Sequence, residues 1–162
     1  MDDQTSLRQH VINLLTKGEA HVDVSSGLKD FPRKLRGRKP EGSPHTPWQL
    51  LEHMRIGQWD ILQFSVDAKH ASPKWPEEYW PKTEAPRTDK AWDKSVSQFL
   101  ADLEEMCKLV RDPKHDLFAR IPHGTGQTLL REALVLADHN AYHLGQIILL
   151  RRTMEGVEGD PK

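Results

Sequence analysis

The sequence predicts an all-α protein, a four-helix bundle, and three observations support this fold class. Apolar residues recur at helical spacing in four long segments. Pro and Gly gather between these segments, and no run of alternating apolar and polar residues predicts a β-sheet. A chain of 162 residues can bury one sizeable core, so we expect a single domain over residues 1–162.

The first helix is expected over residues 6–17, where an apolar stripe starts at Leu7 and Gly18 provides the stop. A long connection, residues 19–45, follows the first helix. This connection contains clustered Ser, Pro and Gly, and it is expected to hold a short helix near residues 22–31.

The second helix has the clearest start in the chain. Thr46 is its expected N-cap, Pro47 suits the first helical position, and Gln49 completes a capping box. Apolar residues at helical spacing continue this helix to about Val66. The next segment, residues 67–87, contains four prolines, which predicts a long loop without helix.

The third helix is expected to open at Thr88 or Asp89 and to end at about Arg111, and the fourth covers residues 127–153. The short link between the third and fourth helices predicts antiparallel neighbours. The longer link between the second and third is long enough for the chain to return along a helix, so these two can run parallel. The expected topology is therefore up-down-down-up, with the fourth helix antiparallel to the second.

The charges of the chain are nearly balanced, with a net charge of -1 and a pI of about 6.8. This balance favours neither a nucleic-acid nor a membrane partner. The basic stretch at residues 33–39 lies among Pro and Gly, and we interpret it as a solvated loop in preference to a nucleic-acid patch. No segment approaches the roughly 18 apolar residues that span a bilayer, and the acidic N-terminus lacks a signal core, so we expect a cytoplasmic protein.

The single cysteine, Cys107, excludes an internal disulfide and a multi-cysteine zinc site. It falls on the apolar stripe of the third helix, next to Met106 and between Leu103 and Val110. We therefore expect a small buried side chain in preference to a nucleophile.

Two histidines in the fourth helix suggest a metal site. His139 and His143 lie four residues apart, so a helix places both imidazoles on one face, one turn apart. Such a pair can bind one metal ion, although the spacing also arises by chance in a chain with 9 histidines.

His53 is the best candidate for a third ligand, because catalytic zinc sites usually have three protein ligands. It lies early in the second helix, roughly 10 Å from the helix start by the 1.5 Å rise per residue, and His143 lies about 15 Å from the end of the fourth helix. In the antiparallel arrangement these levels agree, and Gly57 leaves room one turn after His53.

Several other residues are weaker candidates. Glu132 and Gln146 are each interpreted either as a group that orients an imidazole or as an ordinary surface or packing group. The remaining candidates are expected to be packing or interface groups (Asn140, Tyr142), loop anchors in preference to pocket walls (Trp75, Trp80), and solvated or loop histidines (His10, His21, His45, His70, His115, His123).

The run Trp48-Gln49-Leu50-Leu51-Glu52-His53, followed far downstream by His139-Asn140-Ala141-Tyr142-His143-Leu144-Gly145-Gln146, resembles the DinB/YfiT-like family of metal-dependent enzymes. The resemblance covers nearly the whole chain. It implies a four-helix bundle, a homodimer, and one divalent metal ion per chain held by His53, His139 and His143. Characterised branches of this family are thiol-dependent transferases and isomerases that use low-molecular-weight thiols such as mycothiol or bacillithiol.

Three neutral imidazoles would leave the ion its full charge and at least one open coordination position, which favours activation of a water or thiol nucleophile. Imidazole ligands suit Zn or Ni, with Fe and Mn as further candidates. We therefore expect a transferase or hydrolase reaction on a small-molecule substrate, with a thiol as the cosubstrate in the transferase case. The alternative is a non-enzymatic helical bundle, an interaction or stress-response protein with a vestigial metal site.

Overall fold

The computed structural model describes residues 2–159, and over these residues it contains five α-helices and no strand. The all-α prediction is therefore confirmed. The helices and two short 3-10 turns are α1 (Asp3–Thr16), α2 (Val24–Leu28), η1 (Arg33–Leu35), α3 (Pro47–Val66), η2 (Glu77–Tyr79), α4 (Asp89–Arg111) and α5 (Leu129–Gly159). The short helix expected near residues 22–31 corresponds to α2.

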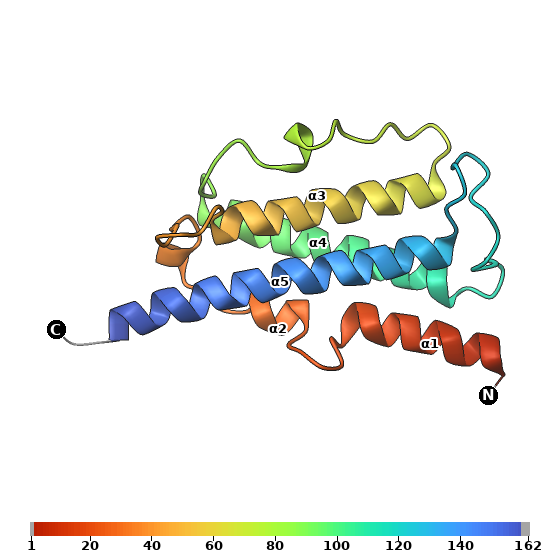
Figure 1. Cartoon of the computed structure of the whole chain (residues 1–162), viewed down its shortest axis with the longest axis horizontal. Helices are drawn as coiled ribbons and strands as arrows, with labels where there is room; N and C mark the ends of the chain where they lie inside the picture. Colours follow the sequence, from red (N-terminus) through yellow and green to blue (C-terminus); the bar gives the residue numbers. More distant parts are fainter. Residues whose placement is uncertain (1, 160–162) are drawn as a thin grey trace.

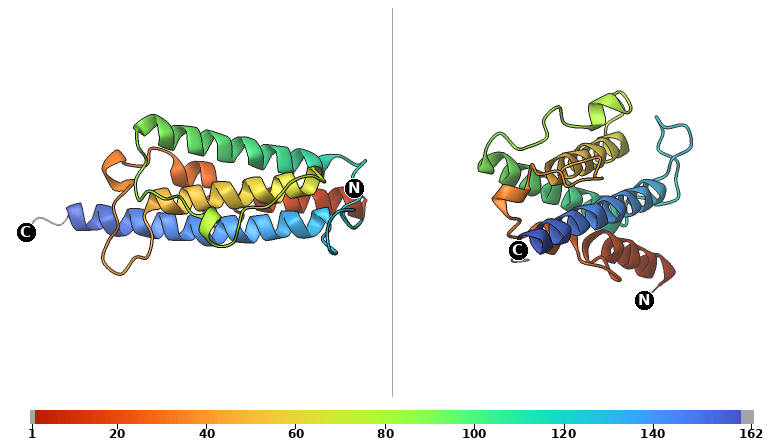
Figure 2. Two further views of the ribbon diagram at one scale, coloured as in Figure 1. Left: turned by 90° about the horizontal axis from the view of Figure 1, so that it is seen from above. Right: turned by 60° about the vertical axis from the view of Figure 1, so that its left-hand side comes forward.

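The four long helices lie side by side around one apolar core (Figures 1 and 2). In Figure 1, α3 and α4 run from left to right, whereas α1 and α5 run from right to left. Contacts between side chains agree with these directions: the rings of Trp48 and Trp92, near the starts of α3 and α4, are 6.4 Å apart. Further along the same pair of helices, the Gln58 amide donates a hydrogen bond of 2.5 Å to the Phe99 carbonyl.

The start of α3 is fixed as its sequence predicts. The backbone N–H of Gln49 donates to Thr46 Oγ1 at 3.1 Å, and the Gln49 side chain accepts from the Thr46 N–H at 3.0 Å. This capping box satisfies two backbone donors that the first turn would otherwise leave unpaired. Because the start of α3 is fixed, the position of each later side chain along the helix axis is fixed as well, including that of His53.

Two helices are longer than predicted. α1 begins at Asp3, earlier than expected, because the Asp2 carboxylate accepts a hydrogen bond of 2.8 Å from the Thr5 N–H and caps the helix. α5 continues to Gly159, past its predicted end at residue 153. Met154, with 1% of its surface exposed, packs into the core and stabilises this extension, which outweighs the cost of about 1 kcal/mol for a helical glycine at Gly156.

The expectation that residues 67–87 contain no helical turn is wrong at one place. A 3-10 turn forms at Glu77–Tyr79, where the Tyr79 N–H donates a hydrogen bond of 3.2 Å to the Pro76 carbonyl and the Glu78 N–H donates one of 2.9 Å to the Lys74 carbonyl. Proline lacks an N–H but keeps its carbonyl, so it can begin such a turn. The segment returns along α3, and η2 lies over the middle of the bundle (Figures 1 and 2).

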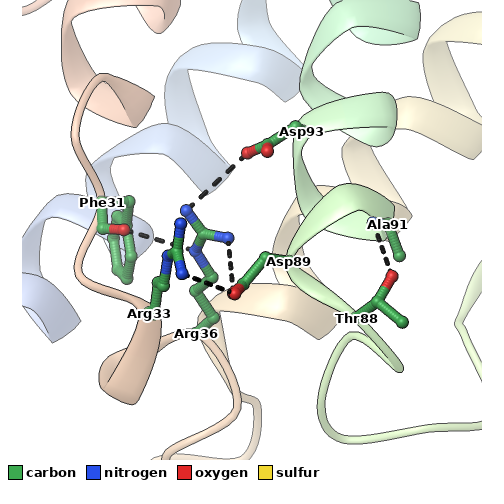
Figure 3. A network of polar contacts seen from close by, with 7 residues as sticks. All are labelled: Phe31, Arg33, Arg36, Thr88, Asp89, Ala91 and Asp93. Atoms are coloured by element: carbon green, nitrogen blue, oxygen red, sulfur yellow. Dashed lines mark hydrogen bonds and ion pairs between the residues drawn. The ribbon is translucent and has the colours of Figure 1, made fainter.

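The basic stretch at residues 33–39 is not simply a solvated loop. Arg36 is only 8% exposed, its guanidinium lies 5.0 Å from the centre of the Trp92 ring, and it donates to the Phe31 carbonyl at 3.3 Å. It also pairs with Asp89 at 3.3 Å and with Asp93 at 3.8 Å, as Figure 3 shows. These carboxylates lie in the first turns of α4, so the stretch docks the chain onto the start of that helix.

Candidate metal centre

His53, His139 and His143 converge at one point between α3 and α5. Each offers one ring nitrogen, and these three atoms lie within 4.8 Å of one another. The two Nε2 atoms of His53 and His139 are 3.1 Å apart. Two nitrogens bound to one ion at about 2.0–2.1 Å would be separated by roughly 2.9–3.4 Å, so this spacing fits a shared metal ion.

The orientation of His53 is fixed by the segment that crosses α3. Its Nδ1 lies 2.9 Å from the backbone carbonyl of Tyr79, and because a carbonyl oxygen only accepts, Nδ1 carries the proton. The Trp80 ring stacks on the imidazole with centroids 4.0 Å apart and an angle of 2°. The unprotonated Nε2 is thereby directed towards the other two histidines.

His143 is oriented by its own helix. Its Nδ1 donates to the side-chain oxygen of Gln146 at 2.7 Å, which leaves its Nε2 as the unprotonated nitrogen. This contact supports the interpretation of Gln146 as an orienting group. Glu132 is neither such a group nor a surface carboxylate: it is 4% exposed and pairs with Arg131 at 2.6 Å.

The ring of the third histidine, His139, occupies space that is open because residue 57, opposite it on α3, is a glycine. A Cβ atom at Gly57 would lie 3.2 Å from Cε1 of His139, closer than most such contacts. The lack of a side chain at Gly57 therefore provides the room that the sequence predicted. Nδ1 of His139 is buried and has no hydrogen-bond partner among the residues that the structure describes.

All three imidazoles are held in the neutral form near neutral pH. Burial, together with the neighbouring His143 and His53, lowers the pKa of His139 to about 4. Burial is also the main cause of the lowered pKa values of His53 and His143. Because only a neutral imidazole binds a metal ion, these shifts prepare the site for a cation.

A cavity of about 430 Å³ opens beside the three histidines. It lies between α3, α5 and the segment that carries η2. Trp75 and Tyr142 line this cavity, so the expectation of a loop anchor at Trp75 is wrong. Tyr142 is 64% exposed and is therefore no packing group within the chain, whereas the alternative of an interface group stays a prediction. Trp80 contacts the site instead through its stacking on His53, and His45 stacks on the opposite face of Trp80 at 4.0 Å.

A second polar cluster, which the sequence pattern did not predict, is formed by Asp60, His70 and Tyr79. The buried Asp60 accepts hydrogen bonds from the Tyr79 hydroxyl at 2.6 Å and from His70 Nε2 at 2.7 Å. The interpretation of His70 as solvated is therefore wrong, since its side chain is only 8% exposed. One signal was available: Asp60 follows His53 by seven residues, two helical turns, and so shares its face with Gly57.

Apart from His45 and His70, the loop and surface histidines make other contacts or are exposed. His123 Nε2 bonds to the Phe64 carbonyl at 2.6 Å, at the end of α3. His10, His21 and His115 are exposed, as predicted.

Asn140 is buried, and its side-chain amide donates a hydrogen bond of 3.0 Å to the Gln58 side chain. This contact joins α5 to α3, so Asn140 is the packing group that was expected.

The sequence matches the DinB superfamily over residues 19–147. The chain belongs to this superfamily. The match spans all three histidines of the cluster, and the resemblance to this family is thereby confirmed. No curated protein and no solved structure matches the chain. Among the described residues of this DinB-superfamily protein, no helix is long and apolar enough to cross a membrane.

Lowering the pH should destabilise the metal-free protein. An unfolded histidine has a pKa near 6.5, and the folded pKa of His139 is about 4. Between these values the unfolded chain binds more protons, so stability is full above about pH 6.5 and falls as the pH drops towards 4. Urea denaturation at pH 5.5 and 7.5 should show a loss of about 1 kcal/mol from His139 alone.

The matched control for this experiment is His139→Gln, which removes the titrating group. Its unfolding free energy should change less between the two pH values than that of the wild type. An equal change in both proteins would contradict the assignment of the effect to His139.

Proposed function

We propose that this protein is a metal-dependent enzyme that acts on a small molecule, with one divalent ion per chain held by His53, His139 and His143. The observation that carries the proposal is the convergence of three imidazole nitrogens within 4.8 Å beside a cavity. Three histidines without a fourth protein ligand are typical of catalytic sites, whereas structural zinc sites are usually closed by four ligands. Zn and Ni are the ions we favour, followed by Fe and Mn.

When bound, the ion would lower the pKa of a coordinated water or thiol and so supply a nucleophile near neutral pH. The protein's own residues have supporting roles. Tyr79 holds His53 through its carbonyl, and Gln146 holds His143, so both imidazoles keep one orientation. The cavity admits a small substrate to the histidines. The reaction we propose is a hydrolysis or a transfer to a low-molecular-weight thiol.

Two residues of types that often act as a nucleophile or a base, Cys107 and Tyr79, do not take that role here. Burial raises the pKa of the Cys107 thiol to about 11, and its side chain is fully buried in the core. Burial and the hydrogen bond to Asp60 raise the pKa of the Tyr79 hydroxyl well above its usual range, so Tyr79 stays protonated. Neither residue is therefore available as a nucleophile or base at neutral pH.

The proposal is tested by a screen of thiol-transfer and hydrolysis reactions with and without a chelator. We expect activity that requires metal and has a basic limb near neutral pH. His53→Ala should lose activity and metal together, whereas Cys107→Ser should keep both. Inactivity of a folded, metal-loaded Cys107→Ser protein would overturn the mechanism. A metal-loaded wild type without any activity in the screen would favour the interaction protein with a vestigial site.

Removing the metal should leave the bundle folded. The apolar core draws on all four long helices and does not need an ion to close it, unlike that of a zinc finger. Circular dichroism of chelator-treated protein should therefore show nearly unchanged helix content. A collapse of the helical signal would mean that the ion holds the fold together.

A further inference from the structure

The cavity beside the histidines has an unusual charge and ring content. Eleven of the described residues line it, and none of these is Lys or Arg. Three of the lining residues are aromatic outside the histidine cluster, namely Trp75, Tyr79 and Tyr142, and two carry carboxylates, namely Asp60 and Asp138. The protein's own side chains therefore provide this cavity with negative charge and ring faces, and with no lysine or arginine to bind an anion.

The two carboxylates are not equivalent. Both oxygens of Asp60 are engaged, one by the Tyr79 hydroxyl at 2.6 Å and the other by His70 at 2.7 Å. Asp138 is exposed, and no hydrogen bond or ion pair of its side chain occurs among the described residues. Asp138 is therefore the carboxylate that remains available to a ligand.

Exposure divides the cavity into a rim and an inner end. Trp75 and Tyr142 are 70% and 64% exposed, and Asp138 lies on the same face of α5 as Tyr142, four residues earlier. The inner end is formed by His53 and His143, which are 3% and 8% exposed. Ring faces and a free carboxylate thus gather at the rim, and the three histidines lie deeper.

We propose that the rim binds the cationic group of a small organic amine or quaternary ammonium compound, with Asp138 as the counter-charge and Trp75 and Tyr142 as ring faces. Aromatic rings attract such cations through the negative charge of their faces, most strongly when an anion lies nearby. A ligand held in this way would direct its other end towards the histidines. That this ligand is the enzyme's substrate rests on the proposed function, whereas binding at the rim does not.

The test compares choline with dimethylbutanol, its uncharged isostere in which carbon replaces nitrogen, and with the dimethylbutanoate anion. Titrations use the full chain after removal of metal, with calorimetry and tryptophan fluorescence as readouts. We expect choline to bind about fivefold more tightly than either analogue, which corresponds to the upper end of the strength of exposed cation–π contacts. Asp138→Asn and Trp75→Leu should each remove most of this preference. Asp3→Asn, an exposed aspartate on α1, is the matched control and should retain it.

Equal affinity for choline and its isostere, or an unchanged preference in Asp138→Asn, would overturn the inference. Metal content is measured on the same wild-type preparation before the chelator is added. Bound metal without choline preference would overturn the rim site alone. Choline preference without metal binding would overturn the proposed function and leave the rim site standing.

Discussion

Replacing His139 with alanine should abolish stoichiometric metal binding. The substitution removes the nitrogen that lies 3.1 Å from Nε2 of His53, and it leaves two imidazoles, which hold a divalent ion far more weakly than three. The helix itself should survive, because alanine favours helix and the core of α5 is unchanged. Elemental analysis of untagged protein should show a fall from one ion per chain to a small fraction.

The matched control is His10→Ala. His10 is exposed on α1, away from the three-histidine cluster, so its loss removes a histidine without touching the site. This variant should keep the metal content of the wild type. Wild-type metal content in folded His139→Ala would refute the assignment of the ligands.

Replacing Asp60 with alanine should weaken metal binding, although Asp60 is not one of the proposed ligands. The Tyr79 hydroxyl and His70 would lose their shared acceptor, and both belong to the segment that crosses α3. The Tyr79 carbonyl, which holds Nδ1 of His53 at 2.9 Å, would then lose its support. Loss of groups that orient a ligand typically costs 10- to 100-fold in metal affinity, and we expect about that loss here.

Competition with a coloured chelator measures this affinity, and urea denaturation measures the accompanying loss of stability. Two lost hydrogen bonds should lower the unfolding free energy by about 2 kcal/mol. Asp67→Asn, an exposed carboxylate after the end of α3, serves as the control and should retain metal affinity. If Asp60→Ala lost stability but bound metal as tightly as the wild type, the cluster would hold the segment without positioning His53.

The features that sequence alone predicted correctly share a local cause. Helical periodicity predicted the four long helices, and the Thr46 capping box predicted where α3 begins. The spacing of His139 and His143 is set by one helical turn. Because the start of α3 fixes the level of His53, even the meeting of the three histidines could be predicted from helix geometry and the expected antiparallel packing.

Sequence alone also left errors, and they concern residues whose partners lie in another segment of the fold. The local pattern around Arg36 predicts a solvated loop, yet Asp89 and Asp93 of α4 pair with Arg36. The pattern around His70 predicts a solvated side chain, yet Asp60 of α3 binds it. No local pattern encodes such contacts, because the path of a proline-rich or glycine-rich segment is decided by what it packs against.

The sequence by itself therefore determined the helices, the positions of three histidines on them, and the family. Only the tertiary structure decided what surrounds those histidines: the Tyr79 carbonyl on His53, the Trp80 ring stacked against it, and the rim of Trp75, Tyr142 and Asp138. The physical reason is that hydrogen bonds within a helix join residues four apart, so the local sequence determines the helix. The conformation of residues 67–87 instead depends on tertiary contacts, which form only when the segment packs against the helices.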